Sequence, residues 1–208
     1  MAVKIKRISF LGYSTTYPGE ELYRDAYETA KAVAEAGYTI VNGGGTGVME
    51  AASKGGKAGG GEVIGVTFYP KGATHFEGRD THNPMDREII TENYLERTLK
   101  LLEIGEIYVI FNGGTGTISE FGMAWGMSRI YFGHHKPMVL YGNFWEKIIK
   151  TFEENMLLRP EELKVYEIAT SPKETVEAIK RLQKIPTLLP AIFGPKKSIF
   201  FSSNLLII

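Results

Sequence analysis

Three things are missing from this 208-residue sequence, and each absence narrows the possible functions. It has no cysteine, which excludes disulfides, thiolate zinc sites and thiol catalysis and is compatible with a reducing compartment. Its 24 basic residues balance its 24 acidic ones, which argues against a broad nucleic-acid surface or a basic membrane patch. No apolar run reaches the roughly 18 residues of a membrane span. We therefore expect a cytoplasmic protein without nucleic-acid or membrane partners.

The composition that remains is that of an ordinary globular domain. Hydrophobic residues make up 43% of the chain and charged residues 23%, and this length suits one domain with a substantial core. We predict a single domain over residues 1–184, followed by an apolar tail over 185–208 that prolines and lysines interrupt. The four histidines lack the spacing of metal ligands, so no metal and no cofactor is expected.

Apolar β-prone runs alternate with helix-like segments along this domain. Short apolar runs predict strands at 7–12, 38–42, 62–67, 88–91, 107–111, 137–141 and 165–169. The segments between them predict helices at 20–36, 47–57, 93–104, 117–131, 144–155 and 172–183. Such alternation is typical of βαβ units. The predicted fold is Rossmann-like and doubly wound, with a mostly parallel sheet and helices on both faces.

Two glycine-rich turns each connect a predicted strand to the start of a predicted helix. The first glycine turn, residues 43–47, contains Gly43, Gly44, Gly45 and Thr46, and the second, residues 113–117, contains Gly113, Gly114, Thr115, Gly116 and Thr117. Glycines let the bare backbone approach an anion, and the first N–H groups of a helix have no internal partner. Both turns, with Gly12 and Ser14 after the first strand, are expected at the carboxyl edge of the sheet as phosphate-binding or nucleotide-binding residues.

Glu120, one helical turn after the second glycine turn, has two interpretations that the local pattern leaves open. The run from Thr117 to Glu120 fits a capping box, in which the carboxylate only caps its own helix. Alternatively, the same carboxylate acts on a ligand that the turn holds. Arg97 has no distinguishing pattern of its own, because its helix also fits a solvated face with an ion pair between Glu96 and Lys100.

Several other residues are candidates for a ligand pocket or for the core. Tyr13, Tyr94, Met49, Met123 and Trp125 could surround a base, although core packing is the commoner role of such side chains. The glycines at 55, 56 and 59–61 favour a helix stop over a site.

Taken together, the motifs resemble those of one known family. Residues 41–49, 60–66, 96–97 and 113–120 occur in the order and spacing of the Lonely Guy (LOG) family, whose members are often mislabelled as possible lysine decarboxylases. The similarity runs from about residue 8 to about residue 183. Three positions depart from the family pattern: Asn112 replaces a proline, Thr98 replaces a lysine, and Tyr94-Leu95 replaces Met-His at an expected pocket wall.

The resemblance implies a homodimer or larger assembly that hydrolyses the N-glycosidic bond of nucleoside 5′-monophosphates such as AMP. The products are a free base and ribose 5-phosphate. The family motif P-G-G-x-G-T-x-x-E maps onto residues 112–120, so Glu120 corresponds to its catalytic glutamate. Arg97 corresponds to its catalytic arginine.

Other functions remain possible on the same scaffold. The main alternative is a non-catalytic protein that binds a phosphorylated ligand, as molybdenum-cofactor carriers resembling this family do. A protein that processes single-stranded DNA is a third possibility, which the neutral charge disfavours. Lysine decarboxylation is rejected, because neither glycine turn is followed by a cofactor-binding lysine.

Overall fold

The computed structural model describes residues 5–70 and 79–185, and in it seven parallel strands form one sheet in the order β4-β3-β2-β1-β5-β6-β7. The strands are β1 (Arg7–Leu11), β2 (Thr39–Asn42), β3 (Val63–Phe68), β4 (Arg87–Thr91), β5 (Ile107–Ile110), β6 (Met138–Tyr141) and β7 (Tyr166–Ala169). The helices are α1 (Glu21–Glu35), α2 (Val48–Ala58), α3 (Tyr94–Ile104), α4 (Thr115–Ile130), α5 (Phe144–Asn155) and α6 (Pro172–Leu182), with a short 3₁₀ helix η1 (Glu162–Lys164).

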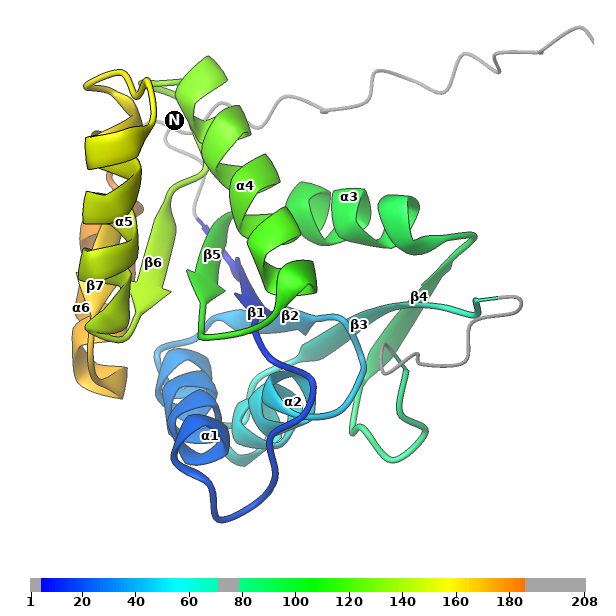
Figure 1. Ribbon diagram of the computed structural model, residues 1–208. Helices are drawn as coiled ribbons and strands as arrows, with labels where there is room; N and C mark the ends of the chain where they lie inside the picture. The colour runs from blue at the N-terminus through cyan, green and yellow to red at the C-terminus, as the bar shows by residue number, and fades with distance from the viewer. Residues whose placement is uncertain (1–4, 71–78, 186–208) are drawn as a thin grey trace, which may run out of the picture.

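Three helices cover each face of the sheet (Figure 1). One apolar cluster joins the sheet to α1, α2 and α6, and a second joins its other face to α3, α4 and α5. The central strands are buried on both faces, which explains why their sequences are apolar runs without alternation. The predicted Rossmann-like, doubly wound architecture is therefore confirmed, with every strand parallel.

The predicted elements are all present, and most of their boundaries move by one residue. The largest shift is at α4, which begins at Thr115 rather than at residue 117. The 3₁₀ helix was not predicted. Apart from Ile185, the predicted apolar tail lies outside the described residues. Within residues 5–70 and 79–185, no helix is long and apolar enough to cross a membrane.

The glycines near residue 55 do not stop a helix as predicted, because Gly55 and Gly56 lie inside α2. A Cβ on Gly55 would collide with the backbone carbonyl oxygen of Tyr27 in α1, and one on Gly56 would crowd Ile40 and Val63 of the sheet. Because these two glycines have no side chain, α2 packs closely against both α1 and the sheet. This packing fixes the start of α2 and the first glycine turn that precedes it. The glycines at 59–61 do end α2 as predicted: Gly59 is its C-cap, Gly60 has a φ of 76°, and the N–H groups of Gly60 and Gly61 donate to the Lys57 and Gly56 carbonyls.

The packing of α1 on α2 predicts the sign of one substitution. Gly55→Ala should destabilise the protein by about 2 kcal/mol or more, because backbone must move to admit the methyl group. Helix propensity alone would instead stabilise the variant by about 1 kcal/mol. Urea unfolding followed by circular dichroism measures the difference. An increase in stability would show that α1 and α2 do not need this close approach.

Candidate functional site

A cavity of about 410 Å³ opens where the carboxyl ends of β1 and β5 meet the first turns of α2 and α4. From β1 the chain proceeds to β2 on one side, and β5 lies on the other, so this is the switch point of the sheet, where ligands bind in doubly wound folds. The lining residues are Phe10, Leu11, Gly12, Tyr13, Ser14, Gly43, Met49, Tyr94, Arg97, Leu101, Gly114, Thr115, Gly116, Thr117 and Glu120.

The second glycine turn presents open backbone to this cavity. Helix α4 has Gly114 as its N-cap, and the Ile118 N–H donates to the Gly114 carbonyl oxygen at 3.0 Å. The N–H groups of Thr115, Gly116 and Thr117 precede that bond and have no intrahelical partner. Gly113 must be glycine, because a Cβ would collide with the Thr117 side chain. The turn and the helix dipole together make a favourable position for an anion.

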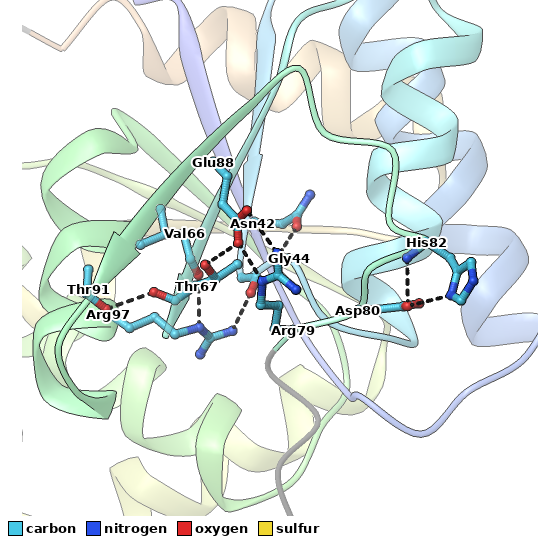
Figure 2. A network of polar contacts seen from close by, with 11 residues as sticks. Asn42, Gly44, Val66, Thr67, Arg79, Asp80, His82, Glu88, Thr91 and Arg97 are labelled. Atoms are coloured by element: carbon cyan, nitrogen blue, oxygen red, sulfur yellow. Dashed lines mark hydrogen bonds and ion pairs between the residues drawn. The ribbon is translucent and has the colours of Figure 1, made fainter. Parts of the chain in front are cut away.

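The first glycine turn is used differently, because its polar groups bind other parts of the chain. Asn42 Oδ1 accepts from the Gly44 N–H at 2.8 Å, and the Gly44 carbonyl accepts from the Asp80 N–H at 2.8 Å. The Gly45 carbonyl accepts from Asn83 Nδ2 at 2.7 Å. Figure 2 shows Gly44 beside Asn42. Of the four residues predicted to bind phosphate here, only Gly43 lines the cavity.

The segment after β1 connects the two turns. The Tyr13 N–H donates to the Asn112 carbonyl at 3.0 Å, and the Tyr13 carbonyl accepts from the Val48 N–H at 2.9 Å. The Ser14 carbonyl accepts from Thr46 Oγ1 at 2.7 Å. Thr46 is therefore a structural residue here, while Gly12 and Ser14 lie in the cavity wall as predicted.

Arg97 is buried, in contrast to the solvated helix face that its local pattern favours. Its Nε donates to the Val66 carbonyl at 3.0 Å (Figure 2). Its Nη2 donates to the Gly43 carbonyl at 3.2 Å and to Met49 Sδ at 3.2 Å. A Cβ on Gly43 would overlap Nη2, so this glycine makes room for the guanidinium. The ion pair expected between Glu96 and Lys100 is replaced by one between Lys100 and Glu103.

Glu120 is also buried, and it faces Arg97 across the cavity rather than capping α4. Glu120 Oε1 lies 3.9 Å from Arg97 Nη1. The capping-box interpretation is wrong, because α4 begins two residues before Thr117 and is capped by Gly114. Burial raises the pKa of Glu120 to about 7, although the Arg97 charge opposes that rise. Burial also lowers the pKa of Arg97. Glu120 is therefore balanced between its acid and its anion near neutral pH.

Aromatic and sulfur side chains form the remaining wall. Tyr13, Tyr94 and Met49 line the cavity, whereas Trp125 packs on Phe121 and donates to the Glu162 carbonyl. Met123 packs with the same apolar cluster as Trp125. Ser119 Oγ donates to the Gly116 carbonyl, so the 2.8 Å hydrogen bond between Tyr94 and Ser119 has the tyrosine hydroxyl as its donor.

Phe10, Leu11 and Leu101 line the cavity but were not predicted as site residues. They sit in ordinary apolar runs of β1 and α3, so the sequence offers no signal that separates them from the core. No group of three or more histidine, cysteine or acidic residues suited to a metal occurs in the part of the chain that the structure describes.

The fold and the cavity define a Rossmann-like protein with an open helix N-terminus beside a buried arginine–glutamate pair. The chain belongs to the SLOG cluster4 family, whose model matches residues 6–166. This result confirms the resemblance drawn from the motifs.

Three similar proteins illustrate the range of this family and fold. An uncharacterized protein of Archaeoglobus fulgidus is 31% identical over 82% of this chain and 100% of its own length. The cytokinin riboside 5′-monophosphate phosphoribohydrolase of Mycobacterium tuberculosis is 33% identical over 60% of this chain and 66% of its own length. The molybdenum cofactor binding protein of Rippkaea orientalis shares the fold, with a TM-score of 0.64 at 24% identity over 87% of this chain and 99% of that one.

Burial of Glu120 predicts a specific dependence of stability on pH. The pKa of about 7 in the folded protein exceeds the ordinary value of 4.5, so the folded state holds the proton more tightly than the unfolded state. Stability should therefore fall as pH rises from about 4.5 to about 7. Glu120→Gln should match the wild type at pH 5 and exceed it by about 1–3 kcal/mol at pH 8, with the lost Arg97 contact offsetting part of the gain. Urea unfolding of both proteins at pH 5 and pH 8 measures the difference between their free energies of unfolding. The same difference at both pH values would contradict the prediction.

Proposed function

We propose that this protein is a phosphoribohydrolase that cleaves the N-glycosidic bond of nucleoside 5′-monophosphates such as AMP. The observation that carries the proposal is the position of Glu120, a buried carboxylate in the cavity one helical turn beyond the open N–H groups of α4. The similarity to the phosphoribohydrolase of Mycobacterium tuberculosis supports it. The products are a free base and ribose 5-phosphate.

In this proposal the 5′-phosphate lies at the start of α4. The N–H groups of Thr115, Gly116 and Thr117 bind its oxygens, and the helix dipole adds to the attraction. Gly114 and Gly116 keep side chains away from the anion. The phosphate contacts hold the ribose in one position, so that binding energy far from the reacting bond serves catalysis.

Glu120 acts on the sugar as the bond to the base breaks. Glycoside cleavage passes through an oxocarbenium-like centre, which a nearby carboxylate stabilises while it orients the attacking water. Its anionic form is needed for this role. Because the pKa of Glu120 is about 7, a large fraction of this side chain is ionised at neutral pH.

Arg97 is a positioning residue in this mechanism. Its Nε and Nη2 are held by the backbone carbonyls of Val66 and Gly43, so the guanidinium has a fixed orientation. The remaining nitrogen, Nη1, faces Glu120 at 3.9 Å. A cation fixed in this way favours the ionised carboxylate and keeps it directed into the cavity.

A second candidate is a protein that binds a phosphorylated ligand without turnover. The same anion position at α4 would serve it, and the fold is shared with the molybdenum cofactor binding protein over nearly all of that chain. Product analysis separates the two functions. An enzyme releases base and ribose 5-phosphate, whereas a carrier returns its ligand unchanged.

We also propose that the protein assembles as a homodimer or larger homo-oligomer. Helix α4 is apolar on more than one side, and part of that apolar surface is exposed at Ile118 and Ile130. A surface of this kind is typical of an interface between subunits.

Catalysis by Glu120 is tested by removing its charge. Glu120→Gln should lower the release of adenine from AMP by about 100-fold or more, the scale of losing a key electrostatic group. The variant should still bind AMP, because the N–H groups of α4 are unchanged. The matched control is Glu96→Gln, which alters an exposed carboxylate on α3 next to Arg97 and should leave the rate near that of the wild type. Base release at the wild-type rate by Glu120→Gln would exclude the catalytic role.

The phosphate position predicts strong discrimination between nucleotide and nucleoside. kcat/KM for AMP should exceed that for adenosine by about 100-fold or more, because adenosine makes none of the anion contacts. Inorganic phosphate and ribose 5-phosphate should inhibit competitively. Similar kcat/KM values for the two substrates would mean that α4 does not bind the phosphate.

A further inference from the structure

Among the described residues, two polar contacts join helix α3 to the first turns of α4. One is the pair of Arg97 and Glu120, whose Nη1 and Oε1 atoms lie 3.9 Å apart. The other is the 2.8 Å hydrogen bond from the Tyr94 hydroxyl to Ser119 Oγ. Tyr94 lies one helical turn before Arg97 on α3, and Ser119 directly precedes Glu120 on α4. The second contact therefore lies beside the first.

The Tyr94 side chain extends from the sheet to the second glycine turn. Its ring packs edge-on against Phe68 in β3, with the ring centroids 6.3 Å apart and the ring planes at 65°. Its hydroxyl oxygen lies beside Gly116, because a Cβ built on that glycine would be 3.7 Å away from it. The side chain also lines the cavity. Tyr94 therefore connects the end of β3 to the start of α4 across the cavity wall.

Ser119 is oriented to accept the hydrogen bond from Tyr94. Its own hydroxyl proton is donated to the Gly116 carbonyl at 2.8 Å, which leaves the oxygen lone pairs for the tyrosine hydroxyl. A phenylalanine at position 94 would present the same ring to Phe68. The tyrosine hydroxyl is therefore needed for the bond to α4 and not for the packing against β3.

The distance between Arg97 and Glu120 depends on where the first turns of α4 lie. The guanidinium is held by the carbonyls of Val66 and Gly43, so β3 and the first glycine turn determine its position. At 3.9 Å its Nη1 lies beyond hydrogen-bond distance of Glu120 Oε1. A displacement of α4 would therefore change the separation of the two charges without breaking the contacts that hold Arg97.

The electrostatic balance of Glu120 makes this separation important. Among the residues that line the cavity, the other titratable side chains are Tyr13, Tyr94 and Arg97, and Arg97 is the charged one. Burial raises the pKa of Glu120, and the Arg97 charge opposes that rise. A larger separation from Arg97 would therefore favour the protonated carboxyl group.

We propose that Tyr94 is a positioning residue, whose hydrogen bond to Ser119 holds Glu120 at its working distance from Arg97. Tyr94 acts on Glu120 through the first turns of α4. The consequence for the rate rests on the proposed function, because it assumes that the ionised Glu120 acts on a nucleotide. The consequence for the ionisation of Glu120 holds for the protein without any substrate.

The first test measures the pKa of Glu120 without substrate. An NMR titration of protein labelled with ¹³C-glutamate gives this pKa, and Glu120→Gln identifies the resonance. Tyr94→Phe removes the hydroxyl and keeps the ring, so no space opens for water. The pKa of Glu120 should rise by about half a pH unit or more, because α4 is free to move away from Arg97. An unchanged or lower pKa would overturn the proposal, whatever happens to the stability of the variant.

A double variant shows whether the effect passes through one hydrogen bond. Ser119→Ala removes the acceptor and should raise the pKa of Glu120 as Tyr94→Phe does. The two substitutions together should raise it no further, because both remove the same bond. The matched control is Tyr131→Phe, which removes a tyrosine hydroxyl at the opposite end of α4 and should leave the pKa of Glu120 unchanged. Additive rises in the double variant would mean that the two residues act separately and would contradict the proposal.

Kinetics on AMP connects the position of Glu120 to the proposed reaction. In Tyr94→Phe, kcat/KM should fall about threefold at pH 6 and stay within about 1.2-fold of the wild type at pH 8.5, where Glu120 is ionised in both proteins. KM should stay nearly constant, because the N–H groups of α4 are unchanged. A raised KM, or an equal loss at both pH values, would instead indicate a direct contact with AMP and overturn the positioning role. If the wild type releases no base from any nucleoside 5′-monophosphate, the proposed function is wrong, and the titration still decides the role of Tyr94.

Discussion

The guanidinium of Arg97 holds the candidate site together. Its hydrogen bonds reach the carbonyl of Val66 in β3, the carbonyl of Gly43 in the first glycine turn and the sulfur of Met49 in α2. Its remaining nitrogen faces Glu120 of α4. A single buried cation thus connects one strand, one turn and two helices. A buried charge requires polar partners, and three of those of Arg97, namely Gly43, Met49 and Glu120, line the cavity.

This arrangement also explains why two similar glycine turns have different tasks. The backbone groups of the first turn form hydrogen bonds with Asn42, Asp80 and Asn83. Because Gly43 has no Cβ, the Arg97 guanidinium fits beside this turn. The second turn keeps the N–H groups of Thr115 to Thr117 open, because the helix they begin offers them no partner. The first turn therefore supports the site, and only the second is suited to hold an anion.

The buried Glu120 carboxylate lowers the stability of the folded protein at neutral pH, but its position in the cavity suits a functional role. Taking Glu120 out of water raises its pKa to about 7 even with Arg97 beside it, so the folded chain carries a cost at neutral pH. Groups whose pKa is strongly displaced in a cavity are frequent at functional sites, where electrostatic preorganisation outweighs stability. Here the displaced group lies one helical turn beyond the open N–H groups at the start of α4, so the phosphorylated ligand that we propose would extend from the turn over the carboxylate.

Local sequence patterns were sufficient to predict the fold. Apolar runs of strand length, glycine stops and helix periodicity each depend on a few consecutive residues, and they recur along the chain in the expected order. The boundaries of α5 and the start of α6 follow directly from them. The same patterns placed Gly12, Ser14 and the second glycine turn at the carboxyl edge of the sheet, and the motif resemblance brought Arg97 and Glu120 into the site. Only the tertiary structure shows that Arg97 is buried and that the missing side chain of Gly43 makes room for its guanidinium. It also shows that Gly44, Gly45 and Thr46 do not line the cavity. These facts depend on contacts between residues as many as 54 positions apart, such as the bond from Arg97 to Gly43, and local propensity carries no information about such contacts.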